Sequence, residues 1–158
     1  MRLLGELIDW SIIVIGAVMI LLVFGNVIFH ISGRDIAWTT EFCELLMVWV
    51  TFLGGAAASR RGLHMTITEF LDMLAPAGRR YADAVIQLLC LGVLGLLVWY
   101  GMGIVNATWG SELTVLHIPM AVQYLALPVG AGAMALFVAW DLAQIVAGRS
   151  RAERYGSH

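Results

Sequence analysis

The chain contains no lysine and few charged residues of any kind. Charged side chains make up 13% of its 158 residues, whereas soluble domains carry about 25%. The formal net charge of -2 argues against a nucleic-acid partner or a strongly basic surface. Hydrophobic residues make up 61% of the chain, and the mean hydropathy is +0.88. This composition predicts an integral membrane protein.

Cysteine is scarce as well. Cys43 and Cys90 lie in two different apolar runs, at different depths of the expected helices. A disulfide requires alpha carbons within about 7 Å, so we expect two free thiols. The sequence has no C-x-x-C pair, nucleophile elbow, phosphate-binding glycine loop or metal-ligand cluster. It therefore predicts no enzyme and no bound metal or cofactor.

Long apolar runs are abundant instead. About 20 helical residues, rising about 1.5 Å each, cross a hydrocarbon core of about 30 Å. Four runs are long enough, which predicts an all-α integral membrane protein with four transmembrane helices in a single membrane domain, residues 1–158. The expected spans are residues 10–29, 38–58, 82–104 and 120–147, with a tail at 148–158.

Two prolines are expected to interrupt helices. Pro76, in the run Pro76-Ala77-Gly78, is expected to end a short helix at residues 64–74, ahead of the third span. Pro128 lies inside the fourth span, where it frees the carbonyl of Tyr124 and predicts a kink.

The segment between the second and third spans has amphipathic character. In residues 64–74, apolar side chains at helical steps predict a short helix lying in the membrane interface, in contact with lipid. Its membrane face would consist of Ile67, Phe70, Leu71 and Leu74.

The arginines indicate the orientation of the spans. Only Arg34 falls on one side of the expected membrane; the other side holds Arg2, Arg60, Arg61, Arg79, Arg80, Arg149, Arg151 and Arg154. Cytoplasmic segments are rich in basic residues. Both termini are therefore expected to be cytoplasmic.

The second span carries an unusual stripe. Three- and four-residue steps place these residues on one helix face: Glu41, Glu44, Val48, Thr51, Gly55 and Ala58. Gly54 lies at the edge of this face, whereas Phe42, Leu46, Trp49, Val50 and Leu53 lie off it. Small residues let helices approach closely in a membrane. The stripe predicts a seam that faces other protein.

Two interpretations of Glu41 and Glu44 remain open. They could form a proton or cation site, as in a self-sufficient small proton-coupled multidrug-type transporter. They could instead be carboxylates near a helix start, stabilised by the helix dipole and by a neighbouring subunit. Coupling sites usually lie near the midplane, at broken helices, whereas these two lie one to two turns inside the span.

The basic cluster after this span also has two interpretations. Arg60 and Arg61, with His64, could be part of a cytoplasmic anchor, or they could contact a partner or lipid head groups. A haem-binding redox subunit is disfavoured, because His30 and His117 lie at the outer ends of spans and no histidine lies well within one.

The order of motifs along the chain resembles one family. Across the second span and beyond it come Trp38-x-x-Glu41, Trp49, Gly54-Gly55-Ala56-Ala57, Arg60 and His64. Later motifs are Gly110-Ser111, Ile118-Pro119, Tyr124 and Leu127-Pro128-Val129-Gly130. Together they resemble the small membrane subunit of tripartite ATP-independent periplasmic (TRAP) transporters, over essentially the whole chain.

This resemblance implies a small permease subunit in the bacterial inner membrane without a transport site of its own. A separate large membrane subunit would carry the substrate and use the sodium gradient, and a periplasmic binding protein would deliver a carboxylate-type solute. The small subunit would brace the large one, helped by a membrane-surface arm helix, which residues 64–74 resemble. On this interpretation, the candidate interface residues are Trp38, Glu41, Glu44, Gly54, Gly55, Arg60, Arg61 and His64.

Overall fold

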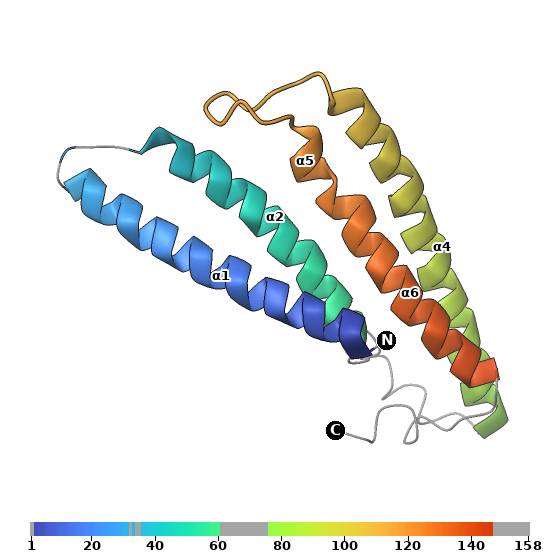
Figure 1. The fold of residues 1–158 in the computed structure, drawn as a ribbon. Helices are drawn as coiled ribbons and strands as arrows, with labels where there is room; N and C mark the ends of the chain where they lie inside the picture. The colour runs from blue at the N-terminus through green and yellow to red at the C-terminus, as the bar shows by residue number, and fades with distance from the viewer. Residues whose placement is uncertain (1, 32, 34–35, 61–75, 147–158) are drawn as a thin grey trace.

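The structure, a computed structural model, describes residues 2–31, 33, 36–60 and 76–146. The helices are α1 (Arg2–Ile31), α2 (Ala37–Arg60), α4 (Pro76–Thr108), α5 (Ala121–Tyr124) and α6 (Ala126–Val146) (Figure 1). Four stretches are long and apolar enough to cross a membrane: Leu3–Ile31, Ala37–Arg60, Tyr81–Thr108 and Ala121–Ile145. The prediction of an all-helical chain with four candidate spans is confirmed. The predicted interfacial helix at residues 64–74 lies outside the described residues.

Two helices begin earlier than the apolar runs indicated. Helix α1 begins at Arg2 rather than near Trp10. Helix α4 begins at Pro76, before the expected span at residues 82–104, and the segment that Pro76 is expected to end lies outside the described residues. Proline fits the first turn of a helix because the amides of that turn have no intrahelical acceptor, and its fixed φ already suits the helix.

The fourth span is interrupted, as Pro128 predicts. Helix α5 ends at Tyr124 and α6 begins at Ala126, with Leu125 as a turn residue between them. Backbone hydrogen bonds continue through Leu125: its amide donates to Ala121 at 2.8 Å, and its carbonyl accepts from Val129 at 3.2 Å. Pro128 has no amide to donate to Tyr124. The disturbance therefore stays local, and the chain continues as one span.

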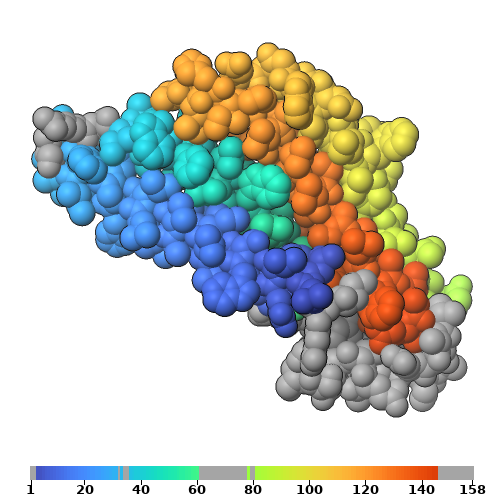
Figure 2. All heavy atoms as spheres, viewed as in Figure 1, coloured from blue at the N-terminus to red at the C-terminus, as the bar shows by residue number. Residues whose placement is uncertain are grey.

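The long helices form a single row rather than a closed bundle. Helix α1 packs along α2, α2 along α6, and α6 along α4 (Figure 1). One end of the row, here called the loop end, holds the end of α1, the start of α2 and the loop at residues 109–120. The opposite end, here called the terminal end, holds the start of α1 and the end of α2. Figure 2 shows α1, α2 and α6 side by side across one face of this row.

Small residues allow the helices of the row to pack closely. A Cβ on Gly130 of α6 would lie 2.5 Å from Cβ of Phe52 on α2 and 3.1 Å from its backbone carbonyl. A Cβ on Gly101 of α4 would lie 3.2 Å from Cδ of Pro128. The buried apolar cluster is small and joins three helices: Ile8, Ala56, Ala57 and Phe137. Because a row leaves two broad faces uncovered, most large apolar side chains are exposed.

Candidate functional site

Glu41 holds the loop between α4 and α5. Its carboxylate accepts hydrogen bonds from the backbone amide of Val115, at 3.0 and 3.1 Å, and from that of Leu116, at 3.0 Å. Glu41 lies just inside the start of α2, and the two amides lie at the turn of the loop. The sequence left the partner of Glu41 open. Here its donors come from the chain itself.

The loop held by Glu41 is ordered by its own backbone hydrogen bonds. The amide of Leu113 donates to the carbonyl of Ile118 at 2.9 Å, and Glu112 forms an isolated antiparallel bridge with Pro119. Between them, His117 has a φ of 52°, a left-handed conformation that is uncommon for a residue other than glycine. Its imidazole lies 3.8 Å from the carboxylate of Glu112. The result is a compact loop that α2 fixes in place.

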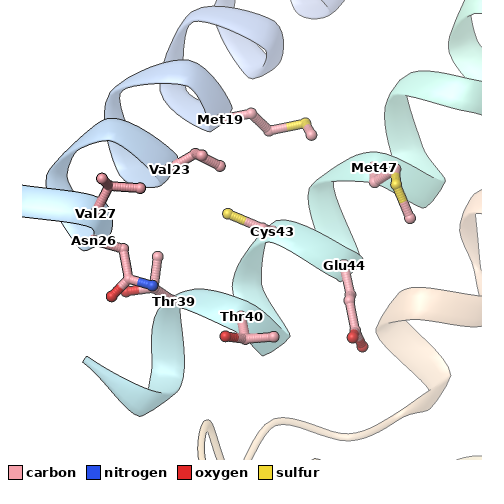
Figure 3. A pocket seen from close by; sticks show the side chains of 9 residues that line it. All are labelled: Met19, Val23, Asn26, Val27, Thr39, Thr40, Cys43, Glu44 and Met47. Atoms are coloured by element: carbon pink, nitrogen blue, oxygen red, sulfur yellow. The ribbon is translucent and has the colours of Figure 1, made fainter. Parts of the chain in front are cut away.

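Glu44 has a different environment. It lies about one turn after Glu41, is exposed, and makes no hydrogen bond or ion pair with any residue that the structure describes. It borders a groove of about 360 Å³ between α1 and α2 near the loop end, shown in Figure 3. The lining residues are Met19, Val23, Asn26, Val27, Thr39, Thr40, Cys43, Glu44 and Met47. Oδ1 of Asn26 is buried there without a hydrogen-bond partner in the described structure.

Two tryptophans of α2 also have defined neighbours. Trp38 stacks edge to face on Phe42, with ring centroids 6.2 Å apart, and remains half exposed. Trp49 donates from its indole nitrogen to the carbonyl of Val122 at 3.3 Å. The stripe analysis placed Trp49 off the seam and missed this contact with α5. No short-range pattern could have found it, because the acceptor is a backbone carbonyl 73 residues away.

At the terminal end, Arg60 pairs with Asp9 of α1. Both side chains are partly exposed, and the guanidinium lies over Gly5, where a Cβ would overlap it. Arg60 therefore links the end of α2 to the start of α1. Arg61 and His64 lie outside the described residues, as do the arm positions Ile67, Phe70, Leu71 and Leu74.

Gly55 of the stripe and Gly54 at its edge differ in their surroundings. A Cβ on Gly55 would overlap the terminal methyl of Met134 on α6, whereas one on Gly54 would meet nothing within 4 Å. Leu53, which the stripe analysis placed off the seam, packs against the buried cluster. Helix α2 lies between α1 and α6, so it packs on two sides, whereas the sequence indicated only one.

A buried polar cluster near the terminal end was not identified from the sequence. Gln87 of α4 donates from its side-chain amide to the carboxylate of Asp141 on α6, and both are buried. Asp83, one turn before Gln87, is also buried. Among the described residues, no group of three or more His, Cys, Asp or Glu side chains is placed to hold a metal ion. Both cysteines are free. The signal for the cluster was present, since Asp83 and Gln87 are spaced four residues apart at the edge of an apolar run.

Comparison with known proteins identifies the family. Residues 8–148 match the family model described as "Tripartite ATP-independent periplasmic transporters, DctQ component". The chain is 30% identical over 110 residues to the C4-dicarboxylate TRAP transporter small permease protein DctQ of Rhodobacter capsulatus, covering 66% of this chain and 47% of that protein. It is 29% identical over 124 residues to the ectoine TRAP transporter small permease protein TeaB of Halomonas elongata, covering 74% and 64%.

A third relative is a longer protein. The sialic acid TRAP transporter permease protein SiaT of Haemophilus influenzae is 25% identical over 111 residues, covering 67% of this chain but only 17% of that protein. The match to the family model extends from α1 to the end of α6 and includes Glu41, its loop and the groove. The chain therefore belongs to the DctQ component of the tripartite ATP-independent periplasmic transporters, as a multi-pass small permease subunit and not an enzyme.

Proposed function

We propose that this subunit is a scaffold that braces a large transport subunit in a sodium-driven TRAP transporter for a carboxylate-type solute. The observation that carries the proposal is the single row of helices. In the apolar core of the first span no residue is buried, and in that of the fourth only 33% are. A row of spans with two uncovered faces offers more surface to a partner than a closed bundle does.

The positions of the polar side chains support a role without transport. Glu41 and Glu44 lie near the loop end, and the Gln87–Asp141 pair lies near the terminal end. Ion-coupling sites of secondary transporters lie near the midplane, at discontinuous helices. The one interruption among the described spans, at Leu125, is within the first turns of the fourth span, near the loop end. The described residues thus offer no charged side chain at the middle of the row.

The alternative function is a self-sufficient proton-coupled transporter built around Glu41 and Glu44. The exposed carboxylate of Glu44 is the observation that favours it. Glu41 argues against it, since its carboxylate already accepts hydrogen bonds from two backbone amides. A proton site needs a group that can exchange its proton with solvent and substrate, and a carboxylate engaged by fixed amides is poorly suited to that exchange.

The solute and the partners are inferred from the family. The relatives named above are described by their transport of C4-dicarboxylate, ectoine and sialic acid, which supports a carboxylate-bearing solute for this system. The much longer SiaT permease supports a large membrane subunit as the partner of the small one. In our proposal, a periplasmic binding protein delivers the solute, and the large subunit carries the sodium and substrate sites.

The orientation is part of the proposal. The arginine distribution supports a bacterial inner-membrane protein with both termini and the terminal end of the row in the cytoplasm. Residues 64–74 would then lie as an arm helix on the cytoplasmic surface, in contact with lipid.

Reconstitution into liposomes tests the proposal. The chain alone, the chain with the large subunit, and both with the binding protein would be compared for uptake of radiolabelled dicarboxylates or sialic acid under a sodium gradient. We expect uptake only from the complete set, and none from the chain alone. Uptake by the chain alone that follows a proton gradient, and that Glu44→Gln abolishes, would establish the proton-coupled alternative instead.

A further inference from the structure

The groove between α1 and α2 contains a carboxylate that needs a donor. Glu44 lies seven residues after the start of α2, which is about 10 Å along the helix. A charged group inside a membrane span is costly to insert, so it usually faces protein or water. No described residue supplies a donor to it.

The walls of the groove are mostly apolar. Met19, Val23, Val27 and Met47 provide an apolar and largely flexible lining, and Cys43 lies between the helices (Figure 3). Methionine adapts its shape to whatever packs on it. The polar groups lie at one end of the groove, where Asn26 faces the start of α2. Its buried Oδ1 lacks a hydrogen bond, so a turn of this amide toward a donor would gain one.

We propose that this groove receives a transmembrane helix of the large subunit that brings a basic side chain to Glu44. The inference rests on the proposed function and adds the surface and the chemistry of the contact. An apolar helix would fill the methionine-lined part of the groove, and its cation would pair with the carboxylate. A pair that is shielded from water in this way is stronger than one at the surface.

Charge complementarity excludes a second copy of this chain as the occupant. The chain has no lysine, and the described residues of the loop end include no arginine; the histidines there are His30 and His117. His30 is one residue from the end of α1, and His117 lies in the loop at residues 109–120. Neither histidine is level with Glu44, seven residues into α2. From the described residues, a homodimer could therefore cover the groove with apolar side chains but would bring no cation to its carboxylate.

Depth argues against a lipid head group as the occupant. Trp38 marks the interfacial level at which aromatic residues gather. Glu44 lies six residues further along α2, about 9 Å deeper. The ammonium group of a phospholipid remains in the head-group layer, outside that depth. Acyl chains can line the apolar part of the groove in the free subunit, but they bring no donor to Glu44.

A pair of tryptophan substitutions tests the surface. Val23→Trp fills the groove, whereas Val93→Trp places the same bulk on an exposed position of α4, outside the groove. Both wild-type side chains are about half exposed, so the isolated subunit should tolerate both changes. With Val23→Trp, the amount of large subunit that co-purifies should fall at least about fivefold, and with Val93→Trp it should change less than about twofold. Equal effects of the two substitutions would overturn the assignment of the groove.

The chain's two cysteines provide a second measurement. In a Cys90→Ser protein, the remaining Cys43 thiol reports on the groove; in a Cys43→Ser protein, Cys90 reports on the exposed face of α4. Labelling with N-ethylmaleimide in detergent should slow at least about fivefold for Cys43 in the complex, and less than about twofold for Cys90. Protection of Cys43 in the isolated subunit, by self-association or by added phosphatidylethanolamine vesicles, would assign the groove to a second copy or to lipid and would overturn the proposal.

A charge substitution tests the chemistry. Glu44→Gln should weaken association with the large subunit about tenfold or more, because it leaves a basic group without its counter-ion. Glu112→Gln, the same change in the exposed outer loop, should leave association unchanged. If the wild-type chain fails to co-purify with the large subunit, the proposed function itself fails. If it co-purifies and neither Val23→Trp nor Glu44→Gln weakens it, the groove proposal alone fails.

Discussion

The carboxylate of Glu41 and the backbone amide of Leu116 lie within a hydrogen bond of 3.0 Å, although 75 residues separate them in the chain. Helix α2 thereby fixes the loop that joins the third and fourth spans. A carboxylate near the start of a transmembrane helix was open to two interpretations, a coupling site or a structural contact. This bond, with those from Val115, supports the structural contact.

Replacing Glu41 by glutamine should loosen the outer loop without unfolding the subunit. The amides of Val115 and Leu116 would lose a charged acceptor, and such hydrogen bonds exceed neutral ones by about 1 kcal/mol. Hydrogen exchange at these two amides should therefore accelerate about fivefold. Glu112→Gln serves as the control, since Glu112 accepts no bond from these amides through its side chain. If hydrogen exchange at these amides is unchanged in Glu41→Gln, the loop keeps its conformation without the carboxylate of Glu41.

Gly130→Ala should destabilise the contact between α2 and α6, whereas Gly132→Ala should not. The added Cβ at Gly130 meets Cβ and the backbone of Phe52, which cannot move aside as a flexible side chain would. A Cβ at Gly132 meets nothing within 4 Å. Overpacking of this kind costs about 1–3 kcal/mol. Thermal unfolding in detergent should show a lower Tm for the first variant alone, and equal values would contradict the close packing of the row.

The helices themselves were predictable because their signals are local. Apolar runs of membrane length identified four spans, and the missing amide of Pro128 predicted the interruption seen at Leu125. Helix α4 begins at Pro76, ahead of the expected span at residues 82–104, and proline has opposite effects in the first turn and in the interior of a helix. The apolar pattern could not show which of these applied.

The site was predictable only in part. The sequence singled out Glu41 and Glu44 together, but their surroundings differ because a distant loop supplies backbone amides to Glu41 and not to Glu44. The single seam expected on α2 assumed one neighbour, whereas Leu53 and Gly55 pack on other elements of the same chain. Which helices become neighbours in a row is a tertiary property that helical spacing does not encode.

The orientation predicts the outcome of reporter fusions. Fusions after His158 and within residues 60–80 should read cytoplasmic, because eight of the nine arginines fall on the side that the sequence predicts to be cytoplasmic. Fusions near Gly33 or Glu112 should read periplasmic. Alkaline phosphatase and green fluorescent protein fusions, active on opposite sides, would be compared at each position. A periplasmic C-terminus would reverse the whole orientation, including the side on which the loop held by Glu41 lies.

The predicted arm helix can be tested by removing its apolar face. Phe70→Asp together with Leu71→Asp should detach residues 64–74 from the membrane interface. Each apolar side chain contributes about 1.5–3 kcal/mol when buried, so assembly with the large subunit or uptake should decrease measurably. The polar positions Thr66 and Thr68 of the same segment, changed to aspartate, serve as the control. Assembly and uptake equal to the parent with both Phe70 and Leu71 replaced would refute the amphipathic helix.

The buried pair of Gln87 and Asp141 should stabilise the contact between α4 and α6. Asp141→Ala removes the acceptor and leaves the side-chain amide of Gln87 buried without it. Hydrogen bonds between transmembrane helices contribute about 0.6 kcal/mol on average and up to about 1.7 kcal/mol, so a loss in this range is expected. Asp141→Asn keeps an oxygen acceptor of the same shape and should lose less. Unfolding titrations in sodium dodecyl sulfate measure both variants. If alanine and asparagine destabilise the subunit equally, the charge of Asp141 matters more than its hydrogen bond to Gln87.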